Sequence, residues 1–101
     1  MGYGNLAKMA QQMHAEMARA EVELQALLVE GSTGGGAVRA TVTGKLDLVS
    51  IAISPEVVDP EDVEMLQDLV TAAVGDALSQ ARKAGEERMA RVTGGLRLPG
   101  M

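Results

Sequence analysis

The chain has 101 residues, no cysteine, a single aromatic residue and a formal net charge of −5. The lack of cysteine excludes disulfide bonds, thiolate zinc sites and cysteine nucleophiles, and no apolar run approaches the roughly 18 residues that a membrane helix needs. We therefore expect one domain, residues 1–101, in the cytoplasm, with a core of Ala, Val, Leu and Met that dimerisation would supplement.

The first 30 residues carry apolar side chains every 3.5 positions, a spacing typical of a coiled-coil seam. This period predicts a helix from about residue 5 to residue 28, with Asn5 as its cap. At about 1.5 Å per residue the seam is roughly 33 Å long, so it needs a partner of similar length, either a second long helix or a second copy of the chain. The seam consists of Leu6, Ala10, Met13, Met17, Ala20, Leu24 and Leu27.

Three strands are predicted next, at residues 28–31, 37–43 and 46–53. The second alternates apolar and polar residues, the period of a half-buried strand. Gly44 and Lys45 predict a two-residue hairpin turn, with Gly44 at a position of positive φ. The third strand is apolar on both faces, so we expect it to be covered on each side or to be central in a sheet shared between two chains.

A second long helix is predicted near the C-terminus. Ser54, Pro55 and Glu56 predict a single helical turn, and the Asp-Pro-Glu-Asp sequence at residues 59–62 repeats that pattern and begins the long helix. The helix is expected to reach about Val92, followed by a mobile tail at residues 94–101. Its apolar face becomes smaller toward the C-terminus and consists of Val63, Leu66, Val70, Ala73, Ala77, Ala81 and Ala84. The predicted fold class is α+β, with element order α-β-β-β-α.

The sequence carries no pattern typical of an enzyme or of a metal or cofactor site. His14 is the only histidine and has no acid–base partner nearby in sequence, and no serine has a nucleophile-elbow context. The acidic residues between Glu56 and Asp68 lack the ligand spacing of a calcium loop. The glycines at residues 34–36 continue into a strand rather than a helix, which favours a flexible connection over a phosphate loop. We expect no catalytic residue, metal or cofactor.

Charge is unevenly distributed along the chain. Taken as a single number, the net charge disfavours nucleic acid and anionic membranes as partners. Residues 54–76, however, carry seven carboxylates and no cation, whereas residues 77–101 carry five cations and two carboxylates. Antiparallel pairing of the two helices, within or between chains, would make a rod with a basic end and an acidic end, and would place Glu21, Glu23 and Glu30 near the acidic segment. The alternative is that these are ordinary solvated charges.

Nearly the whole chain resembles the YbaB/EbfC family of small bacterial nucleoid-associated proteins. One departure is Gly75, where the family pattern often has a polar residue. The resemblance rests on four blocks in order, which are GSTGGGAV at residues 31–38 leading into VTG at 42–44, IAISPE at 51–56, MLQDLVTAA at 65–73 and MARVTGGLRLPG at 89–100.

This resemblance implies an intertwined homodimer with protruding helices that binds double-stranded DNA over the nucleoid, with modest or variable sequence preference. Phosphate contacts from the helix ends are the expected mode, without base-specific readout or a single-strand stacking platform. The main alternative is a protein–protein interaction or adaptor module with weak or no DNA binding, which the net charge favours. The expected DNA-binding residues are Lys8, Arg19, Arg82, Lys83, Arg88 and Arg91.

Overall fold

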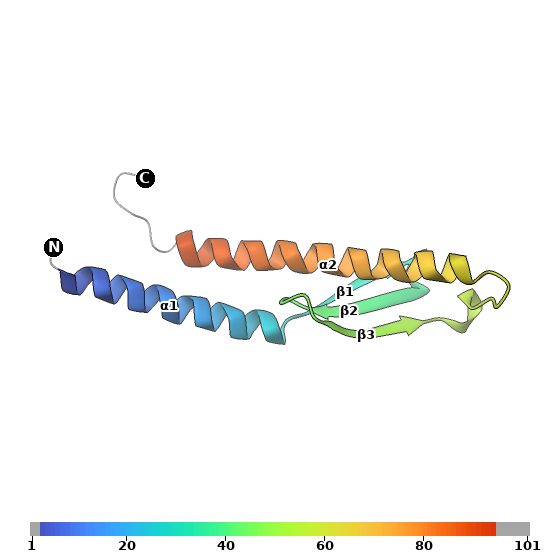
Figure 1. Cartoon of the computed structure of the whole chain (residues 1–101), viewed down its shortest axis with the longest axis horizontal. Helices are drawn as coiled ribbons and strands as arrows, with labels where there is room; N and C mark the ends of the chain where they lie inside the picture. The colour runs from blue at the N-terminus through green and yellow to red at the C-terminus, as the bar shows by residue number, and fades with distance from the viewer. Residues whose placement is uncertain (1–2, 95–101) are drawn as a thin grey trace.

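The computed structural model describes residues 3–94, so the tail expected after Gly94 lies outside the described residues. The molecule is an elongated rod of 71 × 24 × 17 Å, with the start of α1 and the end of α2 at one end (Figure 1). The predicted α-β-β-β-α order and α+β class are confirmed. The elements are α1 (Tyr3–Ala26), β1 (Leu28–Thr33), η1 (Gly34–Gly36), β2 (Val38–Thr43), β3 (Leu48–Ile53), η2 (Pro55–Val57) and α2 (Val63–Gly94).

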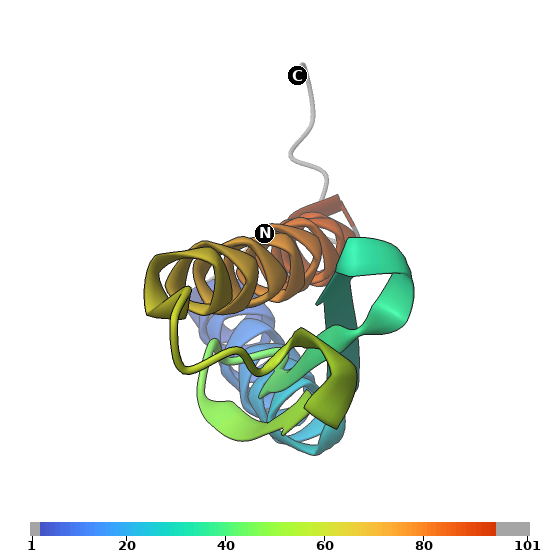
Figure 2. The ribbon, with the colours of Figure 1, turned by 90° about the vertical axis from the view of Figure 1, so that its right-hand side faces the viewer.

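The three strands form one antiparallel sheet in the order β1-β2-β3, and α2 lies along one face of it (Figures 1 and 2). The alternation predicted for β2 is confirmed, because every second residue from Val38 faces α2 and is fully buried. The apolar face predicted for α2 is also confirmed in its middle. The buried core consists of Val38, Ala40, Val42, Ala73, Ala77 and Ala81.

Small side chains allow β1 and α2 to approach closely. A Cβ atom built on Gly31 would lie 2.3 Å from the Ala77 amide nitrogen and 2.5 Å from the Ala73 carbonyl oxygen. The strand and the helix backbone are therefore in direct contact at this point, which only glycine permits.

The predicted two-residue hairpin turn after β2 is wrong. The turn extends to Asp47, and the residue with positive φ is Leu46 (φ 70°) rather than Gly44. The Thr43 hydroxyl accepts hydrogen bonds from the Lys45 and Asp47 amides, both at 3.2 Å, which stabilises the longer turn. Gly44 has a different role, because a Cβ there would lie 2.8 Å from the Leu24 carbonyl oxygen.

Helix α2 begins at Val63, later than the predicted start at residue 59. The Asp59 carboxylate accepts a hydrogen bond from the Glu61 amide at 2.9 Å, which forms a separate turn. Asp62 is the helix cap, because its carboxylate accepts a hydrogen bond from the Met65 amide at 3.2 Å. Two similar Asx signals lie three residues apart, and the second of them starts the helix.

Strand β3 lies at the edge of the sheet, and all six of its residues are exposed. The expectation that the chain covers this strand on both sides is therefore wrong for a single chain. The other alternative, a sheet shared between two chains, is compatible with an exposed apolar edge.

Candidate nucleic-acid interface

Helix α1 and the C-terminal half of α2 lie side by side and antiparallel within one chain, and extend beyond the sheet (Figure 1). Only two residues of the predicted seam on α1 are buried, and Leu27 at its end is 39% exposed. Ala20 and Leu24 are buried, whereas Leu6 remains 60% exposed. Met13 and Met17 are also exposed. The seam therefore continues beyond the surface that α2 supplies.

The six cations predicted to bind DNA all lie on this pair of helices. The described parts at 3–20 and 82–94 hold these six cations and three carboxylates, Glu16, Glu86 and Glu87. Five of the cations are exposed and Arg88 is largely buried. The exposed five are Lys8, Arg19, Arg82, Lys83 and Arg91.

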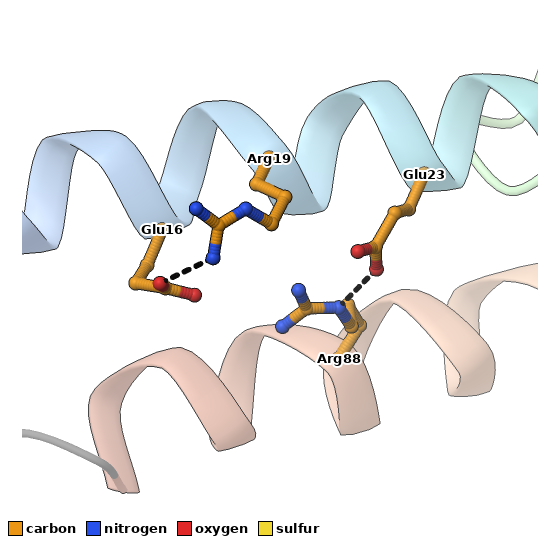
Figure 3. A network of polar contacts seen from close by, with 4 residues as sticks. All are labelled: Glu16, Arg19, Glu23 and Arg88. Atoms are coloured by element: carbon orange, nitrogen blue, oxygen red, sulfur yellow. Dashed lines mark hydrogen bonds and ion pairs between the residues drawn. The ribbon is translucent and has the colours of Figure 1, made fainter.

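Arg19 is paired along its own helix. Its guanidinium donates a hydrogen bond to the Glu16 carboxylate at 2.6 Å, three residues earlier (Figure 3). Both side chains are well exposed, so the pair contributes little to stability and solvent competes with it. The positive charge of Arg19 is nevertheless locally offset.

Arg88 is paired between the two helices. Its Nε donates a hydrogen bond to the Glu23 carboxylate on α1 at 2.7 Å, and its side chain is only 14% exposed (Figure 3). This bond holds the pKa of Glu23 below its ordinary value, and the charges of Arg88, Arg91 and Arg19 act in the same direction. The bond also raises the pKa of Arg88. A shallow hollow of about 280 Å³ lies beside the pair.

The prediction that Glu21 and Glu23 lie near the acidic segment is wrong. Glu23 lies against Arg88 at the basic part of α2, and Glu21 lies 3.7 Å from Lys45 in the β2–β3 turn. The seam repeats at each heptad, so its sequence does not fix the axial register of α1 against α2. Glu30 lies in β1, where its carbonyl oxygen accepts a hydrogen bond from Gln80 on α2.

The opposite end of the molecule is acidic. Residues 54–76 contain no cation, and the loop before α2 lies at the end of the rod farthest from both the start of α1 and the end of α2 (Figure 1). Two of these carboxylates have a local structural role, Asp59 in the turn and Asp62 as the helix cap. Within residues 3–94 no group of three or more His, Cys, Asp or Glu side chains is placed to hold a metal ion.

Two further exposed cations, Arg39 and Lys45, were not among the predicted residues. Arg39 is exposed on β2, with its side chain on the sheet face opposite α2, and Lys45 is in the β2–β3 turn. The alternation of β2 places Arg39 on the outer face, but the sequence gives no reason to group it with the helix cations.

None of the described helices is long and apolar enough to cross a membrane.

The sequence also matches known proteins. The sequence model of the YbaB/EbfC DNA-binding family matches residues 1–96. A protein named "Nucleoid-associated protein" from Moorella thermoacetica is 52% identical, covering 99% of both chains. One from Chloroflexus aurantiacus with the same name is 50% identical and covers 96% of this chain and 97% of its own.

The fold also has a solved counterpart. The crystal structure of an uncharacterised protein, HP0035, from Helicobacter pylori superposes with a TM-score of 0.69 at 24% sequence identity. The match covers 95% of this chain and 97% of that one. At this level of identity the likeness concerns the fold alone.

Proposed function

Because the chain belongs to the YbaB/EbfC DNA-binding family, a nucleoid-associated family and not an enzyme family, we propose that it binds double-stranded DNA as a homodimer, mainly through phosphate contacts and with low sequence specificity. The observation that carries this proposal is the separation of charge along the rod. Cations gather on the paired ends of α1 and α2, while residues 54–76 at the other end hold carboxylates alone. Its expected place in the cell is the nucleoid.

The two edges of the sheet support dimerisation through β3. The outer edge of β1 is occupied by α2, because Gln80 donates to the Glu30 carbonyl at 3.2 Å and the Asp76 carboxylate accepts from the Ser32 amide at 3.1 Å. The β3 edge has no such cover among the described residues. An open, apolar strand edge is a template for pairing with a second chain.

Apolar side chains around this edge also favour a partner. Large side chains on β3, in the segment that follows it and at the first residue of α2 are 39–54% exposed. An apolar groove continues from there along the start of α2. Fully burying one such side chain is worth about 1.5–3 kcal/mol, so a handful can supply a stable two-fold interface. The exposed set consists of Leu48, Val49, Ile51, Ile53, Val58 and Val63.

The oligomeric state tests this part of the proposal. Light scattering on the whole protein at micromolar concentration should give twice the chain mass. Ile51→Lys should shift the mass toward the monomer, because it places a charge on the α2-facing side of β3. Ser50→Lys is the control on the opposite face of the same strand. A wild-type mass of one chain contradicts the proposed dimer.

Salt dependence tests the phosphate contacts. With three or four contacts from each of two subunits, the association constant should fall roughly as the seventh power of salt concentration. The variant Arg82→Glu should weaken binding strongly and lower this power. Arg39→Glu makes the same change in net charge on the sheet face opposite α2 and should have a much smaller effect. Equal losses in the two variants would contradict the assignment to the paired helices.

Low specificity is supported by the composition of the helix ends, where no Asn, Gln and Arg cluster forms a recognition helix. Unrelated duplexes of equal length should therefore compete within a few-fold of one another. A strong preference for one duplex would contradict this part of the proposal.

A protein–protein adaptor is the second candidate, and the acidic end is the observation that favours it. In addition, the net charge of the whole chain is −5, and it opposes DNA binding wherever all of the charges act together. This alternative replaces the first if duplex DNA fails to bind at 50 mM salt while another protein co-purifies in a fixed ratio.

A further inference from the structure

The backbone position of Arg88 lies on the buried face of α2. It lies seven residues after Ala81 and four before Val92, which are 0% and 5% exposed. Residues at these spacings share one face of a helix. Arg88 is therefore the cation that continues the small-residue stripe of α2 toward α1, whereas Arg82 and Lys83 lie on exposed positions.

Glu23 occupies the matching position on α1. It precedes the buried Leu24, and its carboxylate points toward α2, where the Arg88 guanidinium reaches it (Figure 3). Among residues 3–94, this contact is the one hydrogen bond or ion pair that joins α1 to α2. The apolar contact nearby is thin, because Ala20, Leu24 and Val92 are the buried side chains there.

A phosphate can reach the Arg88 Nε only by displacing Glu23. The charge-assisted bond is short, and breaking it would leave a carboxylate beside the incoming phosphate, where like charges repel. Arg82 and Arg91, the exposed arginines of α2, form no ion pair within 4 Å among the described residues. Arg88 is thus poorly placed to bind DNA and well placed to fix one helix against the other.

We propose that Arg88 is a positioning residue rather than a phosphate contact: through Glu23 it sets the spacing of α1 and α2, and so the spacing of Lys8, Arg82 and Arg91. This inference rests on the proposed DNA binding. The pair acts on DNA indirectly, by holding cations from two helices at a fixed separation. Preorganised contacts of this kind bind more tightly because fewer groups are ordered on binding.

The first test compares the salt dependence of duplex binding for two variants. Arg88→Met keeps the length and apolar stem of the side chain. It should weaken binding several-fold while leaving the slope of log K against log salt unchanged. Arg82→Met should lower that slope by about 2 per dimer, at about 0.9 per phosphate lost. An equal fall in slope for Arg88→Met overturns the proposal.

The second test neutralises the partner. Glu23→Gln should weaken binding as Arg88→Met does, and the double variant should be no weaker than either single variant, because both remove one interaction. Glu86→Gln is the matched control, an exposed carboxylate at the same end of the rod whose removal should strengthen binding slightly. Stronger binding by Glu23→Gln than by Glu86→Gln would mean that Glu23 restrains a DNA-binding Arg88, and would overturn the proposal.

The third test does not depend on DNA. The chain has no cysteine, so Gln11→Cys and Ala90→Cys, both exposed, allow a spin label on each helix. In dimers diluted with unlabelled chain, the distance distribution should broaden in Arg88→Met and Glu23→Gln and stay narrow in Glu86→Gln. An unchanged distribution in the first two overturns the positioning role. If the wild type binds no DNA, the proposed function fails but this measurement still decides whether the pair positions the helices.

Discussion

The contact between β1 and α2 at Gly31 predicts opposite effects for the same substitution at two glycines. In Gly31→Ala the new Cβ would meet Ala77 N at 2.3 Å, Ala73 O at 2.5 Å and Ala77 Cα at 2.8 Å. These are backbone atoms, so no side-chain rotation relieves the overlap. Since carbon atoms pack at about 3.5–4.0 Å, the strand and the helix must separate by about 1 Å.

That separation weakens packing along the buried core, because a gap of 0.5–1 Å forfeits about a quarter to a half of each contact's attraction. We expect a loss near the upper end of the range for overpacked cores, about 3 kcal/mol. In Gly75→Ala nothing lies within 4 Å of the new Cβ, and the helix interior should gain about 1 kcal/mol.

Thermal unfolding by circular dichroism, at one fixed protein concentration, measures both changes. For a chain of this size about 4–8 °C accompanies each kcal/mol, so Gly31→Ala should melt at least 12 °C lower and Gly75→Ala several degrees higher. Fixed concentration is essential because assembly makes the melting temperature depend on it. If Gly31→Ala were as stable as the wild type, the close approach of strand and helix would be refuted.

Three further predictions concern the cap, the turn and acid pH. Asp62→Ala should lower the free energy of unfolding by about 1 kcal/mol in urea titration, because the Met65 amide loses its acceptor. Leu46→Asn should raise it by up to about 1 kcal/mol in the same assay, since Asn tolerates the positive φ better than Leu. The pKa of Glu23 is lowered in the folded chain, so the stabilisation from its bond to Arg88 is present above the ordinary glutamate pKa of about 4.3 and is lost as pH falls through the lowered value. The spin-label distances should therefore broaden at acid pH in the wild type and change little in Glu23→Gln.

The sequence predicts those elements whose residues follow a single strong period. The alternating residues of β2 and the alanine stripe of α2 form the two halves of the buried core, and the sequence pattern of each predicts it independently of the other. The β2–β3 turn is less predictable, because Gly44 attracts attention as a turn residue while the positive φ falls on Leu46, which has no turn propensity. Glycine is required at position 44 because its backbone packs closely against Leu24, and the local sequence does not predict this tertiary contact.

The candidate site is predictable in part for a related reason. Antiparallel pairing is enough to gather the cations of both helices at one end, and this holds over a range of axial registers. The partner of Arg88 depends on one particular register, which a heptad repeat leaves open. Position in the helix does carry a signal, because Arg88 falls in phase with Ala81 and Val92. An arginine within an apolar stripe is a sign that a carboxylate faces it from the neighbouring element.

The net charge is a poor guide to what this chain binds, and the reason is its shape. The rod is 71 Å long, and the carboxylates of residues 54–76 lie toward one end while the candidate cations lie toward the other. At about 0.1 M salt the electrostatic screening length is about 10 Å, several times shorter than the rod. A phosphate near Arg91, which is about 22 Å along α2 from Asp76, therefore experiences the local charges, which are positive in sum, and very little of the distant carboxylates. At about 0.01 M salt the screening length rises to about 30 Å, and only then does the acidic end oppose binding.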